Sequence, residues 1–310
     1  MKISLEDIAV NFGCTKESFS PAFLEHFKTL DMRYELLSRV ERDSIILDIL
    51  NKIKVDTQRI GAPKRTGVWQ TGWKENLDGF IKNRSVEEIV PKFIRPNKII
   101  RYNGDFIKPS NPFFERDFAK LIQIYCYDNF IKNYSVDNVY EFGCGSSFNL
   151  MTMIDLNIDS DLRFFGSDFV QSSVDLCNEL GTHYDVDLEG FLFNMIEPDT
   201  SKTIRKNSAV FTFGAIEQLN SKFENFISYL LQNKVKICFH VEPTIENYDP
   251  NDLFDHLQIR FHSKRGYTQG LLPHLKNLEL QGKINIVKNK RLNFGSKFME
   301  GYHLYAWEIN

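Results

Sequence analysis

The sequence has few cysteines, and they form no recognisable pattern. Five are scattered through 310 residues, their number is odd, and no two stand in a Cys-x-x-Cys arrangement. A disulfide framework or a structural zinc site would need paired or regularly spaced cysteines. We therefore expect reduced thiols in a cytoplasmic protein that binds no metal.

The sequence also lacks long apolar runs and a strong charge of either sign. No stretch approaches the roughly 18 apolar residues of a membrane span, and the N-terminus has no apolar signal region. The formal net charge is −3 and the isoelectric point is near 6.2, whereas a general nucleic-acid-binding surface is basic. We therefore expect neither a membrane nor a nucleic acid as partner.

Aromatic residues, by contrast, are abundant. They make up 14% of the chain, and 27 of them are phenylalanines. This content predicts large cores or a ligand pocket with aromatic walls. Because the chain is longer than one minimal α/β domain, a core domain with an appendage is the expected organisation.

A strand, a tight glycine turn and a helix are predicted near the middle of the chain. The apolar run Val139–Phe142 is followed by Gly143 and Gly145, and a helical pattern starts near Phe148. This arrangement presents backbone N–H groups at a helix N-terminus to a cofactor. Glycine is needed where the backbone takes a positive φ or a ligand comes close.

The acid beside this turn indicates which cofactor to expect. Glu141 would repel a pyrophosphate, whereas a cofactor with a cation or an amino group tolerates a carboxylate. Glu141-x-Gly143-x-Gly145 resembles the first motif of the class I S-adenosylmethionine-dependent methyltransferases, an acid followed by x-Gly-x-Gly-x-Gly. Ser147 replaces the third glycine. The resemblance implies that these four residues bind S-adenosylmethionine; a structural turn in another Rossmann-like domain is the alternative.

Two further strands carry residues that the resemblance assigns to the same cofactor. The strand Leu162–Asp168 ends in an acid, and the resemblance implies that Asp168 binds the ribose hydroxyls and that Phe169 contacts adenine. Asn194, near the end of the strand Gly190–Met195, is the expected ligand of the adenine amino group. Asp168 would also serve as an N-cap for a helix beginning near Val170.

The fourth strand, Ser208–Phe213, leads into a polar loop. The resemblance places this loop beside the sulfonium and the incoming substrate. It implies that Gly214 and Glu217 contact the cofactor and that Gln218 contacts the substrate. Glu217 has a simpler interpretation as a favourable acid at a helix N-terminus.

General bases are expected near the end of the fifth strand, 235–241. His240 and Glu242 lie on one side of that strand, near the sheet edge where α/β proteins bind ligands. With His262 they are the predicted catalytic residues, since a histidine near its ordinary pKa takes a proton from a hydroxyl. His240-x-Glu242 is half of a metal site at most, because no third ligand has a recognisable spacing.

Substrate-binding residues are expected in two segments outside these strands. Trp69 and Trp73 are interpreted as a wall of the substrate pocket, with a helix face packed on the core as the alternative. Arg265 and Tyr267 lie in a polar break, 261–267, where the family inserts substrate-recognition elements. A solvated loop is the alternative there.

The whole chain is expected to be an α/β protein with a Rossmann-like seven-stranded sheet. Alternating segments at 283–288 and 302–309 predict an antiparallel C-terminal hairpin, as in class I methyltransferases. The residues 293–296 between them have turn chemistry and are expected to be loop, and a further β-hairpin is expected around Asn103 and Gly104. We assign residues 113–310 to the methyltransferase domain and residues 1–112 to a mainly helical N-terminal appendage or lid. A homodimer contact is another use for the appendage.

The resemblance implies an enzyme that transfers a methyl group from S-adenosylmethionine, leaving S-adenosylhomocysteine as product. The expected acceptor is a small polar metabolite with a hydroxyl, either sugar-like or a natural product. A catalytically silent scaffold with the same fold remains an alternative. So does a protein or nucleic-acid methyltransferase, although the Asn-Pro-Pro-Tyr type of motif is missing. An NAD-dependent oxidoreductase is disfavoured by Glu141.

Overall fold

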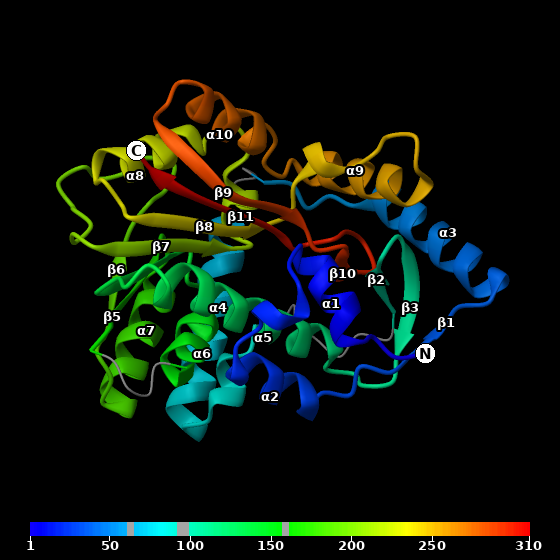
Figure 1. Cartoon of the computed structure of the whole chain (residues 1–310), viewed down its shortest axis with the longest axis horizontal. Coiled ribbons are helices and arrows are strands. Elements are labelled where there is room, and N and C mark those ends of the chain that lie inside the picture. The colour runs from blue at the N-terminus through cyan, green and yellow to red at the C-terminus, as the bar shows by residue number, and fades with distance from the viewer. Residues whose placement is uncertain (61–64, 92–98, 157–160) are drawn as a thin grey trace.

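A seven-stranded sheet forms the centre of the computed structural model, which describes residues 1–60, 65–91, 99–156 and 161–310. Its strands are β4 (Asn138–Phe142), β5 (Arg163–Asp168), β6 (Leu188–Leu192), β7 (Ser208–Phe213), β8 (Ile237–Glu242), β9 (Ile284–Arg291) and β11 (His303–Ile309). They lie in the order β6-β5-β4-β7-β8-β11-β9 (Figure 1). The first five are parallel, and β11 pairs antiparallel with both β8 and β9. The expected fold class and its C-terminal hairpin are confirmed.

Helices lie on both faces of this sheet and against one another. They are α1 (Leu5–Phe12), α2 (Pro21–Thr29), α3 (Arg39–Val55), α4 (Arg65–Asn83), α5 (Phe114–Cys126), α6 (Phe148–Leu156), α7 (Gln171–Tyr184), α8 (Glu224–Gln232), α9 (Leu253–Arg265) and α10 (Leu271–Leu280). Short 3₁₀ turns occur at Lys16–Ser18, Val86–Ile89, Ile216–Leu219 and Ile245–Asn247, and a π-helical turn, Tyr127–Lys132, extends α5.

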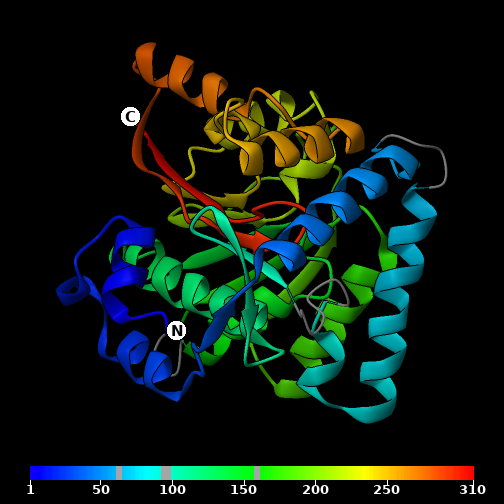
Figure 2. The ribbon, with the colours of Figure 1, turned by 90° about the vertical axis from the view of Figure 1, so that its right-hand side faces the viewer.

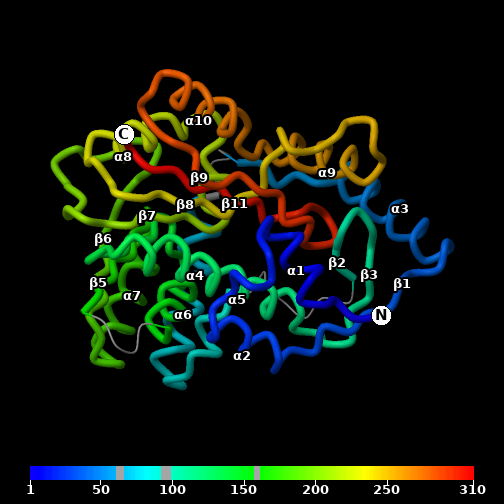
Figure 3. Tube along the Cα trace, in the orientation of Figure 1, coloured from blue at the N-terminus to red at the C-terminus, as the bar shows by residue number. Residues whose placement is uncertain are grey.

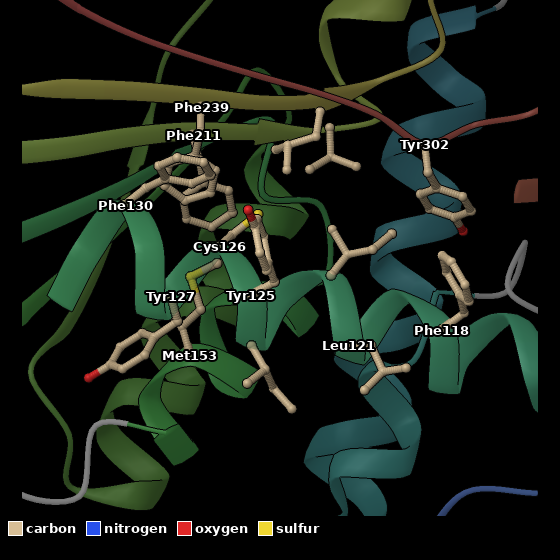
Figure 4. Packing of buried hydrophobic residues seen from close by; sticks show 14 of the residues in the cluster. Phe118, Leu121, Tyr125, Cys126, Tyr127, Phe130, Met153, Phe211, Phe239 and Tyr302 are labelled. Carbon is tan, nitrogen blue, oxygen red and sulfur yellow. The ribbon is translucent and has the colours of Figure 1, made fainter. Parts of the chain in front are cut away.

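The side chains of each strand point alternately to the two faces of the sheet, so the core consists of two layers. Phe211 of β7 and Phe239 of β8 stack with ring centroids 5.0 Å apart (Figure 4). They lie on the face that α1, α5 and α6 cover. Val210 and Cys238, which directly precede these two phenylalanines, point to the other face, which α8 and α10 cover. Side chains of successive strand residues point to opposite faces, which explains why these central strands are apolar throughout.

The described N-terminal segment is mainly helical, but it also contains three short strands, of which the first was not predicted from the sequence. β1 (Tyr34–Leu36), β2 (Ile100–Tyr102) and β3 (Asp105–Pro109) form a second sheet with β10 (Phe294–Ser296), in the order β1-β3-β2-β10. The hairpin expected at Asn103 and Gly104 joins β2 to β3. β10 was expected to be loop. Three residues are too few to show a period of two, and the β10–β2 pairing depends on the tertiary fold.

The hydrophobic core continues across the expected boundary between residues 112 and 113. Phe118 of α5 stacks on Phe12 of α1, at 6.2 Å between ring centroids, and on Phe294 of β10, at 3.9 Å. The N-terminus lies near the second sheet, and the chain ends with β11 at the other side of the molecule (Figure 3). In the described part of the chain, no helix is long and apolar enough to span a bilayer.

Candidate functional site

A cavity of about 390 Å³ opens at the carboxyl ends of the parallel strands. Segments following β4, β5, β6 and β7 contribute to it, together with α4. The lining residues are Ile60, Thr66, Trp69, Trp73, Gly143, Asp168, Phe169, Phe193, Asn194, Met195, Ile196, Gly214, Ala215, Gln218 and Leu219. Eight of the predicted cofactor and substrate residues therefore meet at one place, and they come from five separate segments. The volume lies within the range typical of small-molecule sites.

The glycine turn after β4 has the backbone that its sequence predicts. Gly143 and Gly145 have φ values of +77° and +53°. A Cβ on Gly143 would lie 2.4 Å from the Cβ of Ala215, and one on Gly145 would lie 2.7 Å from the ring of Trp73. Glycine is thus required both by conformation and by close packing. Ser147 also has a positive φ, +60°, but it is buried and does not line the cavity.

Asp168 connects the end of β5 to the glycine turn. Its Oδ2 accepts the N–H of Gly145 at 3.0 Å, and its Oδ1 accepts the N–H of Val170 at 3.2 Å. The residue is only 4% exposed, and burial raises the pKa of its carboxyl to about 6, although these N–H groups act in the opposite direction. Asp168 is therefore both a support of the turn and a carboxylate at the cavity wall.

Glu141 supports the turn from below instead of lining the cavity. Its side chain is fully buried, and its Oε1 accepts a hydrogen bond from Asn149 Nδ2 at 2.7 Å. Within the described residues, Oε2 has no hydrogen-bond partner. Burial raises the pKa of this carboxyl well above its ordinary value.

The loop after β7 reaches the cavity through Gly214 and Gln218. Glu217, which was expected there, is half-buried beside it, and its Oε1 accepts the Gln218 amide N–H at 2.6 Å. The carboxylate of Glu242, at the end of β8, accepts the backbone N–H groups of Ala215, Ile216 and Glu217 at 3.0 to 3.1 Å. Glu242 is therefore a structural support of this loop, not a group facing a ligand.

The structure does not bring His240 or His262 to the cavity. His240 is fully buried: Nδ1 lies 3.0 Å from Thr212 Oγ1, and Nε2 accepts the indole N–H of Trp307 at 3.1 Å. His262 Nε2 lies 2.8 Å from the carbonyl oxygen of Thr268. Burial lowers the pKa of His240 to about 3 and that of His262 to about 4. The cavity where these general bases were expected is therefore lined by none of His240, Glu242 and His262.

Trp69 and Trp73 form one wall of the cavity. Their rings stack with centroids 5.7 Å apart and an interplanar angle of 18°. Their helix, α4, runs along one side of the molecule (Figure 2) and is fastened to α7. Ser172 Oγ donates to the carbonyl of Gln70 at 3.0 Å, and Arg84 forms an ion pair with Glu179. Both tryptophans were expected at the substrate pocket.

Arg265 and Tyr267 do not line the cavity. Arg265 Nε donates to Asp56 Oδ2 at 2.6 Å, which connects the end of α9 to the end of α3. Tyr267 is buried in a cluster with Phe261 and other residues of α3 and α9. The expected substrate loop at 261–267 is mostly the last turns of α9, and Arg265 there connects α9 to α3.

Sequence reasoning missed the aliphatic part of the lining. Ile60, Met195, Ile196 and Leu219 carry no chemical signal that separates them from core residues. Met195 and Ile196 were detectable only as neighbours of Asn194. Among the described residues, no group of three or more His, Cys, Asp or Glu side chains is placed to hold a metal ion.

The described lining suits a cofactor that carries a sulfonium. Asp168 is its one ionisable side chain, and it is an acid. The faces of Trp69, Trp73 and Phe169 attract cations through their negative π-clouds. A carboxylate beside the glycine turn would oppose a pyrophosphate, so the donor set fits S-adenosylmethionine better than a dinucleotide.

No protein-family model matches this sequence, and no curated protein matches it. Several solved structures are similar in fold. An O-methyltransferase from neocarzinostatin biosynthesis, solved with S-adenosylmethionine and 2-hydroxy-5-methyl naphthoic acid, is 10% identical; the match covers 87% of this chain and 70% of that one, with a TM-score of 0.44. A geranyl diphosphate methyltransferase in complex with S-adenosylmethionine is 9% identical over 66% of this chain and 93% of its own, with a TM-score of 0.45.

The [4+2]-cyclase SpnF is similar to the same degree. It is 10% identical, the match covers 82% of this chain and all of that one, and the TM-score is 0.48. Likenesses of this size carry no inference about activity, and the fold assignment rests on the sheet itself. Five parallel strands in the order β6-β5-β4-β7-β8 are followed by β11, which is antiparallel to β8, and by β9, and together they form the Rossmann-like seven-stranded sheet expected of a class I methyltransferase fold.

Proposed function

We propose that this chain is an S-adenosylmethionine-dependent methyltransferase that acts on a small molecule. One observation supports this above all others. A positive-φ glycine turn, the Asp168 carboxylate and two stacked indoles converge on a single cavity at the carboxyl edge of the sheet. This edge is where α/β sheets bind their ligands.

Each wall of the cavity has a part in holding the cofactor. Asp168 would accept hydrogen bonds from the ribose hydroxyls, and Phe169 and Asn194 would contact adenine. Gly143 and Gly145 would allow the rest of the cofactor to come close to the backbone. The bound cofactor supplies an electrophilic methyl group. The protein contributes alignment of the acceptor and exclusion of water, which is the proximity part of catalysis.

The lining favours an acceptor with a flat, apolar body over a sugar-like one. Trp69, Ile60, Ile196 and Leu219 offer surface for stacking and apolar contact, and Gln218 offers an amide. Among the described lining residues, Asp168 alone titrates near neutral pH. An acceptor hydroxyl that is acidic by itself, such as a phenol, needs the least help from a general base.

Calorimetric titration with S-adenosylhomocysteine, with NAD as the comparison ligand, tests the cofactor. We expect the product to bind and NAD not to bind. Asp168→Ala should weaken binding at least about tenfold, since it removes hydrogen bonds to a charged group. Asp175→Asn, an exposed acid on α7, is the matched control and should bind normally. Absence of binding, or tighter binding of NAD, would overturn the proposal.

Turnover is tested separately by incubating the protein with S-adenosylmethionine and a panel of phenols and naphthols, with hexoses for comparison. Formation of S-adenosylhomocysteine with a member of the aromatic set supports the acceptor class. Binding without turnover on any acceptor would favour the silent scaffold. A homodimer stays a prediction, to be measured by analytical ultracentrifugation.

A further inference from the structure

Two cysteines face each other directly behind the glycine turn. Cys144 stands between Gly143 and Gly145, and Cys177 lies on α7. Both sulfur atoms occupy the hollow above Gly166 of β5. A Cβ built on Gly166 would lie 2.7 Å from Cys177 Sγ and 3.1 Å from Cys144 Sγ. The separation of the two sulfurs therefore cannot exceed the sum of these two distances, and the missing side chain at Gly166 provides their space.

The surroundings of the pair make the two thiols unequal. Cys144 Sγ lies 3.5 Å from Ser173 Oγ, and that hydroxyl donates to the carbonyl of Gly145. Interaction with the Cys144 thiol lowers the pKa of Cys177, whereas the pKa of Cys144 is raised well above its ordinary value. Since the thiolate is the reactive form, Cys177 is the first of the two to react with an oxidant.

We propose that Cys144 and Cys177 form a disulfide when the protein meets hydrogen peroxide, and that this bond weakens binding at the cavity. The second half of this proposal rests on the proposed function. A disulfide brings two sulfurs to about 2 Å, so it draws the middle of the glycine turn toward α7. The same turn carries the Gly145 N–H that Asp168 accepts and places Gly143 at the cavity wall.

The chemistry needs no other reactant. The Cys177 thiolate attacks one oxygen of the peroxide, the O–O bond breaks, and hydroxide leaves with a sulfenic acid formed on Cys177. The Cys144 sulfur then attacks the Cys177 sulfur, the S–O bond breaks, and the departing hydroxide takes the thiol proton as water. The first hydroxide recovers the proton that Cys177 had released. Two thiols and one peroxide thus give one disulfide and two waters.

In this proposal peroxide reaches the buried pair from the cavity. Gly143 lines it, and Cys144 is the next residue in the chain. Cys126 and Cys238 are also buried, and burial raises the pKa of both thiols, so they react less readily. They therefore serve as matched controls.

The test exposes the purified full-length chain to hydrogen peroxide, alkylates free thiols and maps the peptides by mass spectrometry. S-adenosylhomocysteine affinity is measured by calorimetry on the reduced, oxidised and dithiothreitol-treated protein. We expect one disulfide, between Cys144 and Cys177, about tenfold weaker binding after oxidation, and full recovery on reduction. Reduced Cys177→Ser should bind like the native protein and keep its affinity in peroxide, whereas Cys126→Ser should lose it.

The outcomes separate this proposal from the proposed function. If the reduced protein binds no S-adenosylhomocysteine, the proposed function fails, while peptide mapping still decides whether the disulfide forms. Absence of a Cys144–Cys177 disulfide after oxidation would overturn the proposal that these two thiols react with each other. A mapped disulfide with unchanged affinity would overturn its coupling to the cavity.

Discussion

Asp168 is a buried side chain that supports the glycine turn and also lines the cavity. It accepts two backbone N–H groups, from Gly145 and Val170, and still forms part of the cavity wall. Burial outweighs these two hydrogen bonds, so the pKa of its carboxyl rises from the ordinary value of 3.8 to about 6. In the absence of a ligand, ionisation of Asp168 therefore costs stability. This contribution is fully favourable below pH 3.8 and is lost as the pH rises through about 6.

Ligand binding should follow the opposite trend. Ribose hydroxyls donate to the ionised carboxylate, so we expect S-adenosylhomocysteine to bind more tightly as the pH rises from about 5 to about 7. Below the pKa, affinity should fall by up to about tenfold per pH unit. Calorimetry at several pH values measures this. Asp168→Asn should bind weakly with no such dependence, and a native affinity that is flat across this range would contradict the assignment.

Among the elements, the loop after β7 depends most on a neighbouring strand. Its backbone N–H groups at 215–217 point at one carboxylate, Glu242 of β8, which is buried in the same layer. The loop presents Gly214 and Gln218 to the cavity. Glu242 therefore positions Gly214 and Gln218 at the cavity indirectly, by holding the backbone between them.

We expect Glu242→Gln to destabilise the protein by about 1–3 kcal/mol, because an amide N–H would replace an acceptor and leave a buried donor without a partner. Urea unfolding measures this change. Glu246→Gln is the control: that half-buried carboxylate accepts the N–H of Gly270, and its substitution should cost less. An equal loss of stability in the two variants would show that the three hydrogen bonds accepted by Glu242 do not hold the loop in place.

At the scale of the whole molecule, the appendage and the sheet domain share one core. A single hydrophobic cluster contains Ile3 and Phe12 near the N-terminus, Phe118 in α5, and Leu304 and Ala306 in β11. The second sheet likewise takes three strands from residues before 113 and one strand from the C-terminal part. Removal of either part would expose large aromatic surfaces of the other.

The isolated segment 113–310 should therefore not fold cooperatively. Phe118 would lose its contact with Phe12, and β10 would lose β2 as its partner. Thermal unfolding followed by circular dichroism measures this, with the full chain, which should give one transition, as the reference. A sharp transition of the fragment near that of the full chain would instead establish two independent domains.

Local chemistry in the sequence predicted the elements whose signals lie within a few residues. The strand expected at Ser208–Phe213 is β7 with the same bounds, and Asn103 and Gly104 make the expected hairpin. Gly143 and Gly145 form the expected turn, because only glycine tolerates that backbone and that proximity. Strand period, turn residues and glycine conformations are local properties, so one sequence is enough to find them.

The tertiary structure alone decided which polar side chains reach the cavity. His240 and Glu242 stand at the correct end of a strand, yet Trp307, Thr212 and the 215–217 backbone occupy their polar atoms. Arg265 pairs with Asp56, which is far away in the sequence. Buried polar groups must find partners, and those partners come from distant segments. Their pairing, and with it the choice between core and site, is fixed only when the layers pack.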